Sequence, residues 1–351
     1  MNNPEQTQSA GEGALAVQAG RDVHVQQGLS LDEVRQVAVD LFEANFYRLS
    51  LVAREEATIR AEFITERFLR KLSEENPEGF VQANEPSFQH ALLTVQTEHA
   101  KAGDLDLGDL LVDLLVDRSK QKQRDLLQLV LDESLATAPK LTNGQLANLA
   151  VVFIIRYTKN TSVVSHGALG GYLDKFVIPF AEALVTSDSS FSHLEFTGCG
   201  STSALVSMSV EDLLLTNYPA LFSKGLLSKE IADEGFSEDV ARRIFVPCLN
   251  DPARLQVGII RESEIEPVLL SRGVPSADID RTKAIFLRNI MTSDEIRSKI
   301  LEIRPAMAVV LEKWSNSGMQ QLSLTSVGRA IGHANVKRLV GPFGDLAIWI
   351  N

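Results

Sequence analysis

The 351-residue sequence has few cysteines, no excess of basic charge and no long apolar run. Its two cysteines, Cys199 and Cys248, are too few for a disulfide framework and favour a reducing compartment. The formal net charge of -12 argues against broad, nonspecific binding of nucleic acid, although it is compatible with a local basic patch. The most apolar run, 146–155, is far shorter than the roughly 20 residues of a membrane-spanning helix. Residues 1–13 lack the basic and apolar regions of a signal peptide, so we expect a cytoplasmic protein without a membrane span.

Motifs for nucleotides and metals are missing as well. The sequence has no Walker A loop, and its six histidines form neither H-E-x-x-H nor a zinc spacing with the cysteines. The densest charge cluster is acidic, and its last three members repeat every four residues, which places them on one helix face. The cluster consists of Asp104, Asp106, Asp109, Asp113 and Asp117. Because this spacing does not match a calcium loop, we interpret the cluster as a solvated acidic face and expect no metal and no cofactor.

The dominant predicted element is one very long amphipathic helix over 30–76. Ser30 and Glu33 have the spacing of a capping box at its start, and Asn76-Pro77 ends it. Apolar residues recur at helical spacing between these ends. A continuous helix of this length would extend roughly 65–70 Å, so it needs neighbours from this chain or from a second copy.

The rest of the chain predicts further helices and few strands. A helix over 87–102 is expected to end at Gly103, and 107–134 fits two helices or one interrupted helix. Thr142/Gln145 and Thr292/Glu295 have the spacing of capping boxes that begin two later helices. Apolar residues alternate with polar ones over 15–25, and 345–350 has β-propensity, so we expect a short strand at each end of the chain. The first strand could pair within the chain or with a neighbouring subunit. The expected fold is mainly α, with a small β element formed by terminal strands. We divide it into a tail with a strand or hairpin (1–28), a helical domain (29–186) and a smaller, mostly helical domain (187–351).

A glycine-rich loop, Gly198-Cys199-Gly200, follows His193. Small residues around a cysteine can mark an exposed nucleophile whose neighbouring amides stabilise an oxyanion. The loop fits neither the G-x-S-x-G elbow nor the dinucleotide fingerprint. We therefore favour a tight loop with a structural cysteine, and we keep Cys199 and His193 as the candidate catalytic residues of an alternative enzyme hypothesis.

The two ends of the chain carry distinctive phrases: QAGRDVHV at 18–25, LSLTSVG at 322–328, GHAN at 332–335 and IWI at 348–350. Together they resemble a poorly characterised family of bacterial proteins. The Leu-x-Leu-Thr-x-x-Gly phrase is also similar to helical proteins associated with abortive infection. The resemblance implies a bacterial source and a role in bacterial conflict or phage response, and it supplies no catalytic residues. The candidate binding residues lie in or beside these phrases: Arg21, Asp22, Arg329, His333, Lys337 and Arg338.

The leading hypothesis is a non-enzymatic oligomerising sensor, adaptor or scaffold, working in phage defence as a homo-oligomer or with a protein partner. It is motivated by the isolated N-terminal strand, the long helix and the lack of a recognised catalytic constellation. One alternative is an enzyme with a site at Cys199. Another is a nucleic-acid or nucleotide sensor that uses a local patch including Arg329, Lys337 and Arg338.

Overall fold

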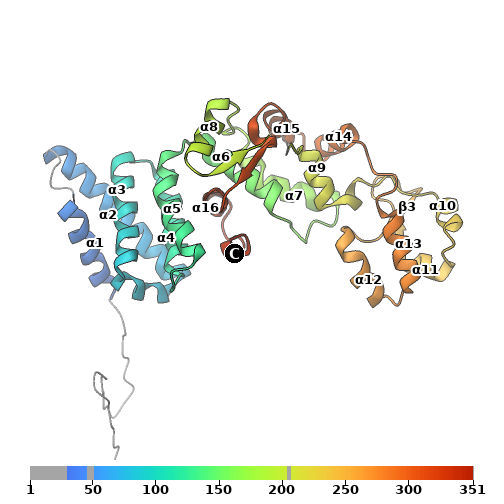
Figure 1. Ribbon diagram of the computed structural model, residues 1–351, viewed down its shortest axis with the longest axis horizontal. Helices are drawn as coiled ribbons and strands as arrows, with labels where there is room; N and C mark the ends of the chain where they lie inside the picture. Colours follow the sequence, from blue (N-terminus) through green and yellow to red (C-terminus); the bar gives the residue numbers. More distant parts are fainter. Residues whose placement is uncertain (1–29, 46–50, 204–206, 351) are drawn as a thin grey trace, which may run out of the picture.

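The computed structural model describes residues 30–45, 51–203 and 207–350, and this part of the chain is mainly helical, as predicted (Figure 1). Its strands form two short antiparallel pairs. β1 (Gly200–Thr202) pairs with β4 (Leu322–Leu324), and β2 (Phe245–Pro247) pairs with β3 (Leu255–Val257). Within the described ranges, none of the helices combines the length and apolar character needed to cross a bilayer.

Five helices form one end of the molecule, at the left of Figure 1. They are α1 (Leu31–Asn45), α2 (Leu51–Glu75), α3 (Pro86–Ala102), α4 (Leu105–Ser119) and α5 (Leu126–Thr137). The predicted stop after α3 is confirmed, because Gly103 caps this helix in the left-handed conformation at φ 65°. Of the two alternatives for 107–134, two helices or one interrupted helix, the structure has two helices, α4 and α5.

The prediction of one very long helix over 30–76 is wrong. The residues between α1 and α2, 46–50, lie outside the described part, and the chain has folded back by the time it reaches Glu66. Arg35 forms an ion pair with Glu66 at 2.7 Å, whereas 31 residues of continuous helix would separate them by roughly 46 Å. Phe42 of α1 is buried with alanines of α2, Ala57 and Ala61, whose small side chains permit close helix contact. The apolar stripe thus finds its neighbour within the chain.

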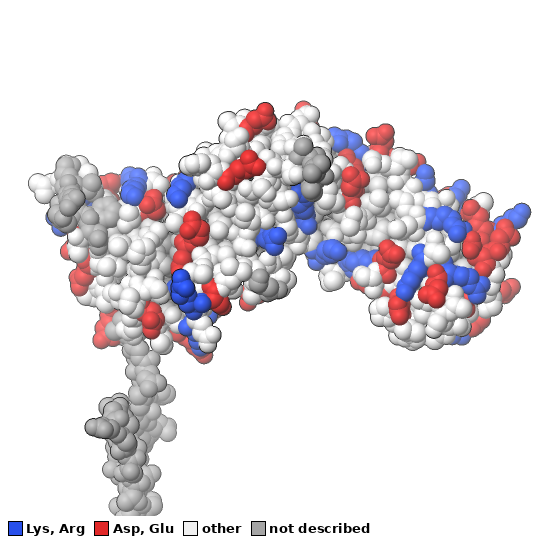
Figure 2. Space-filling view, in the orientation of Figure 1, with Lys and Arg blue, Asp and Glu red and all other residues white. Residues whose placement is uncertain are grey.

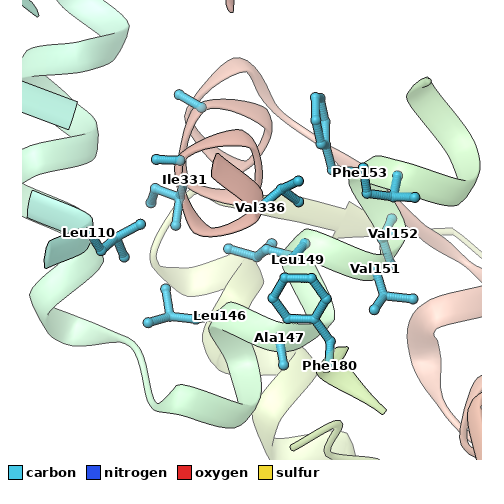
Figure 3. Packing of buried hydrophobic residues seen from close by; sticks show 14 of the residues in the cluster. Leu110, Leu146, Ala147, Leu149, Val151, Val152, Phe153, Phe180, Ile331 and Val336 are labelled. Carbon is cyan, nitrogen blue, oxygen red and sulfur yellow. The ribbon is translucent and has the colours of Figure 1, made fainter. Parts of the chain in front are cut away.

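The middle of the molecule joins segments from both halves of the sequence. Its elements are α6 (Asn143–Val152), α7 (His166–Phe176), α8 (Asp188–Phe196), β1, α9 (Val210–Asn217), α14 (Ser293–Ile303), α15 (Met307–Ser315), β4 and α16 (Ser326–Val340). Helix α16 is the centre of this part, and it packs against α4, α5 and α6. Figure 3 shows Ile331 and Val336 of α16 facing apolar residues that include Leu110 of α4 and Leu149 of α6.

A small module forms the opposite end, at the right of Figure 1. It contains α10 (Ser228–Asp233), α11 (Glu238–Ile244), β2, β3, α12 (Ile265–Ser271) and α13 (Ser276–Phe286). This module has a hydrophobic core of its own between residues 220 and 286, whereas the main core runs from Val34 to Ile350. On the face in Figure 2, both signs of charge are interspersed over the module. The division of the chain at 186/187 stays a prediction.

The predicted β element of terminal strands is not what the structure describes. The expected strand over 345–350 is a short 3-10 helix at Leu346–Ile348, because Asp345 caps that turn by accepting from the Ala347 amide. The C-terminal strand lies earlier, at β4, and its partner is β1. The predicted strand over 15–25 falls outside the described residues.

Candidate functional site

Four of the six candidate binding residues lie on one helix, α16, and two of them lead to the candidate site. His333 and Lys337 are one turn apart and therefore share a helix face. Arg338 lies beside Lys337 and pairs with Asp106 at 2.7 Å. The other two candidates, Arg21 and Asp22, are outside the described residues.

Lys337 is the hub of a network of ion pairs between three helices. Its Nζ lies 2.7 Å from Glu75 of α2, and 3.5 Å and 3.4 Å from Asp113 and Asp117 of α4. Two further lysines complete the network. Lys71 of α2 lies 2.5 Å from Asp113, and Lys120, which follows α4, lies 2.6 Å from Asp117. Ion pairs therefore connect α16, near the end of the sequence, with α2 and α4 in its first half.

The prediction of a solvated acidic face at 104–117 is wrong for its second half. Asp113 and Asp117 are buried, since α16 and α2 cover the face that carries them. Asp104 has another role, because its side chain caps α4 by accepting from the amides of Asp106 and Leu107. Only Lys120 is close in sequence to these aspartates, whereas Lys71 and the covering helices α2 and α16 are distant, so the local pattern contains no signal of this burial.

Burial and charge act in opposite directions on the two buried carboxyls. Burial raises the pKa of Asp113 above its usual range, and the hydrogen bond and charge of Lys71 only partly offset this. Burial also acts to raise the pKa of Asp117, but Lys337 and Lys120 outweigh it and the pKa is lowered. Around Lys337, the carboxylates outweigh the effect of burial and raise the pKa of the ammonium. The network therefore keeps Lys337 charged.

A pocket of about 420 Å³ opens beside this network. Its volume is within the range of small-molecule sites, roughly 300–1,000 Å³. The C-terminal ends of three helices meet around it: α2 ends at Glu75, α4 at Ser119 and α16 at Val340. Its wall is completed by the loop after α16. The lining residues are Lys71, Glu75, Asp117, Lys120, His333, Lys337 and the segment 341–346.

The histidine of the pocket is held in one tautomer. His333 Nε2 lies 2.6 Å from the carbonyl oxygen of Gly344, so Nε2 carries the proton and donates it, and Nδ1 is left as an acceptor. This Nδ1 is buried and has no hydrogen-bond partner among the described residues. Burial lowers the pKa of His333. The negative charges of Asp117 and Asp345 favour the protonated ring, but they offset the effect of burial only in part. The ring is thus an uncharged acceptor.

An aromatic cluster fixes the loop that closes the pocket. Phe343, which lines it, stacks on Trp349 with ring centres 5.7 Å apart, and His333 meets both rings edge-on or tilted. The Trp349 indole donates to the Tyr157 carbonyl at 2.8 Å. These contacts hold the chain end against α16, so the loop position depends on the core.

Arg329 faces a different part of the structure. Its guanidinium lies over the Tyr157 ring, 4.5 Å from the centroid, and it donates to the carbonyl of Trp349 at 3.2 Å. The sequence phrases at 322–328, 332–335 and 348–350 therefore meet in one place, but Arg329 supports the chain end there and does not line the pocket.

The structure gives Cys199 and His193 separate surroundings. Cys199 is buried, its sulfur accepts from the Thr197 hydroxyl at 3.6 Å, and burial raises the pKa of the thiol. His193 Nδ1 lies 3.0 Å from Nε2 and 3.3 Å from Oε1 of the Gln145 amide. A raised thiol pKa is the opposite of what a nucleophilic cysteine needs.

The cysteine loop instead supports α16. The amide of Thr325 donates to the Cys199 carbonyl at 3.1 Å, and a Cβ on Gly328 would lie 1.8 Å from the same oxygen. Only glycine allows this approach. The glycine-rich loop at 198–200 and the LSLTSVG phrase at 322–328 are therefore in contact with each other, and the β1–β4 pairing adds to this contact.

Sequence reasoning missed three residues that line the pocket, Lys71 and Glu75 of α2 and Lys120, which follows α4. Mixed charges on a long helix are typical of a solvated surface, and no local feature separates these three from their neighbours. The described residues contain no group of three or more His, Cys, Asp or Glu side chains arranged to hold a metal ion.

Comparison with known proteins gives a match over nearly the whole chain. A protein-family model described as ":-like" matches residues 28–350. No curated protein and no solved structure matches. The matched range contains every residue of the pocket.

Proposed function

This chain belongs to the family whose model, described as ":-like", covers residues 28–350, and we propose that it is a non-enzymatic oligomerising sensor or adaptor. Its ligand binds in the pocket between α2, α4 and α16. The association surface lies on α2. The pocket would serve the sensing role, and the surface of α2 would serve the assembly role.

The observation that carries this proposal is the position of Lys337. Its ammonium contacts α2 and α4 from α16 and lines a pocket at the same time. A ligand in this pocket competes with, or adds to, the ion pairs that hold the last long helix against the first ones. Binding energy can therefore change how α16 is seated, which is the requirement for a sensor.

An exposed apolar stripe on α2 supports association. Val52, Ile59 and Phe63 are spaced by seven and four residues, so they share one helix face, and they are 80%, 56% and 41% exposed. The opposite face of α2 is buried in the core. A second copy of this chain is the proposed occupant, since a two-fold contact places the same stripe on both sides.

Phage defence in a bacterial cell is the proposed setting. It rests on the resemblance of the LSLTSVG phrase to helical proteins associated with abortive infection. In the structure, Thr325 of this phrase donates hydrogen bonds to the carbonyls of Cys199 and Gly198 and so holds the start of α16 against the cysteine loop.

The two alternatives receive less support. The enzyme hypothesis needs a reactive Cys199, whereas this thiol is buried with a raised pKa. The nucleic-acid hypothesis needs free cations, whereas Lys337 and Arg338 are ion-paired and Arg329 is engaged with Tyr157 and Trp349.

The proposal is tested by the solution mass of the full-length protein and of Ile59→Glu, measured by light scattering. We expect the wild-type protein to be a dimer or larger and Ile59→Glu to shift toward the monomer with an unchanged circular dichroism spectrum. Leu270→Glu is the control, because Leu270 is similarly exposed, at 53%, on α12 of the small module. An unchanged mass for Ile59→Glu would overturn the assignment of the association surface.

A further inference from the structure

We infer that the pocket between α2, α4 and α16 takes a small organic amine, bound through its ammonium group. This inference rests on the proposed function and names the ligand class of the same site. Three observations support it: the negative electrostatic field of the pocket, the acceptor Nδ1 of His333, which is unpaired among the described residues, and the ion pairs that already engage the lining lysines.

The helix ends make the field of the pocket negative. The lining lysines, Lys71, Lys120 and Lys337, are balanced by three lining carboxylates, Glu75, Asp117 and Asp345. The C-terminal ends of α2, α4 and α16 add their carbonyl dipoles, each equivalent to roughly half a negative charge. The sum of these charges and dipoles is negative, which favours binding of a cation.

One lining residue, His333, also has a buried acceptor that lacks a donor among the described residues. His333 is 2% exposed, and its Nδ1 has no hydrogen-bond partner in the described part of the chain. Since Nε2 already donates to Gly344, the ring offers a ligand only a lone pair. An unsatisfied buried acceptor is costly, and a ligand N–H removes that cost.

The lysines are not available for an anionic ligand. Lys337 and Lys71 are the cations beside Asp113, whose side chain is 1% exposed, and Lys337 and Lys120 are those beside Asp117. A phosphate or carboxylate would draw these ammonium groups away and leave buried carboxylates without partners, which is strongly unfavourable. An amine adds a donor and breaks no existing pair. The ring of Phe343 on the pocket wall adds a surface that suits a cation.

The test is calorimetric titration of the full-length protein with tyramine, putrescine and spermidine at low ionic strength, with inorganic phosphate and ATP as rival probes. We expect saturable 1:1 binding of at least one amine and none of the two anions. Asp345→Asn should weaken this binding about tenfold, the loss typical of one charge-assisted hydrogen bond. The asparagine oxygen can still accept from the Ala347 amide, so the 3-10 turn is retained.

Two further variants decide whether the effect is local. Glu75→Gln should also weaken amine binding, because it leaves Lys337 with more unpaired positive charge at the pocket. Glu238→Gln removes the same charge from the small module and should leave the affinity unchanged. Equal affinities for Asp345→Asn and Glu238→Gln would overturn the inference, as would the absence of binding by all three amines or saturable binding of an anion. The proposed oligomer is measured separately through Ile59→Glu, so the two ideas can fail independently.

Discussion

The ammonium of Lys337 lies 2.7 Å from the carboxylate of Glu75, although 262 residues separate the two in the sequence. This pair fastens α16 to the end of α2, and the same ammonium reaches two buried aspartates of α4. The family match over residues 28–350 includes both partners. The pocket exists because these distant segments meet.

Removing the hub of the network should destabilise the protein. Lys337→Met leaves the buried Asp113 and Asp117 with one close lysine each, and breaking a buried pair of this kind typically costs about 3 kcal/mol or more. Urea unfolding followed by circular dichroism measures the loss. Lys122→Met is the control, since Lys122 is exposed and only loosely paired with Glu78, and should cost less than about 1 kcal/mol. Similar losses for both variants would show that the network is not buried.

Acid should weaken the fold partly through His333. Burial lowers the pKa of this ring in the folded protein, so below the ordinary histidine pKa of 6.5 the unfolded chain gains a proton that the folded protein does not. Stability is therefore present above pH 6.5 and declines as the pH falls from there toward the lowered pKa. His333→Gln should make the decline in unfolding free energy between pH 7.5 and 5.5 shallower; both pH values are about one unit from the ordinary pKa. An identical slope would contradict this assignment. The buried His99, whose pKa is also lowered, should supply a remaining decline.

Two glycine substitutions should have opposite effects. Gly328→Ala places a methyl group 1.8 Å from the carbonyl oxygen of Cys199, which neither backbone can accommodate, and should cost about 2 kcal/mol or more. Gly171→Ala on α7 meets nothing within 4 Å and should stabilise by about 0.5–1 kcal/mol, the usual gain from alanine in a helix. Thermal unfolding of the two variants distinguishes them. A neutral Gly328→Ala would show that α16 does not lie against the cysteine loop.

The thiol of Cys199 should be unreactive in the native protein. It is buried and its pKa is raised, so little thiolate is present and reagents cannot reach it. Ellman's reagent should titrate both cysteines in denaturant and neither one rapidly in native buffer, because Cys248 is buried too. Fast native labelling that maps to Cys199 would revive the enzyme alternative.

Local chemistry was the part of the fold that could be predicted. The patterns Thr142/Gln145 and Thr292/Glu295 predicted capping boxes, and both begin helices in the structure. Gly103 predicted the end of α3 because glycine readily adopts the left-handed conformation of a helix cap, which is also a local property. The prediction of one helix over 30–76 failed because the apolar spacing continues from α1 to α2 without a break, and only tertiary contacts, Arg35 with Glu66 and Phe42 with the α2 alanines, reveal the reversal.

Of the residues that line the candidate site, the sequence pointed to those of α16 as binding residues but not to those of α2 or to Lys120. His333 lies in the GHAN phrase and Lys337 lies just beyond it, whereas Lys71, Glu75 and Lys120 did not differ from ordinary surface residues. The burial of Asp113 follows from α2 and α16, which are both distant from it in the sequence, and no pattern at 104–117 encodes that. A charge network of this kind is a property of the tertiary structure.

The proposal of an oligomer is tested most directly by light scattering on the wild-type protein over a wide range of concentrations. We expect a stable mass that is a multiple of the 38.5 kDa chain, at least a dimer, at all but the lowest concentrations. A mass of 38.5 kDa throughout the range would contradict it and leave the exposed stripe on α2 without the partner proposed here.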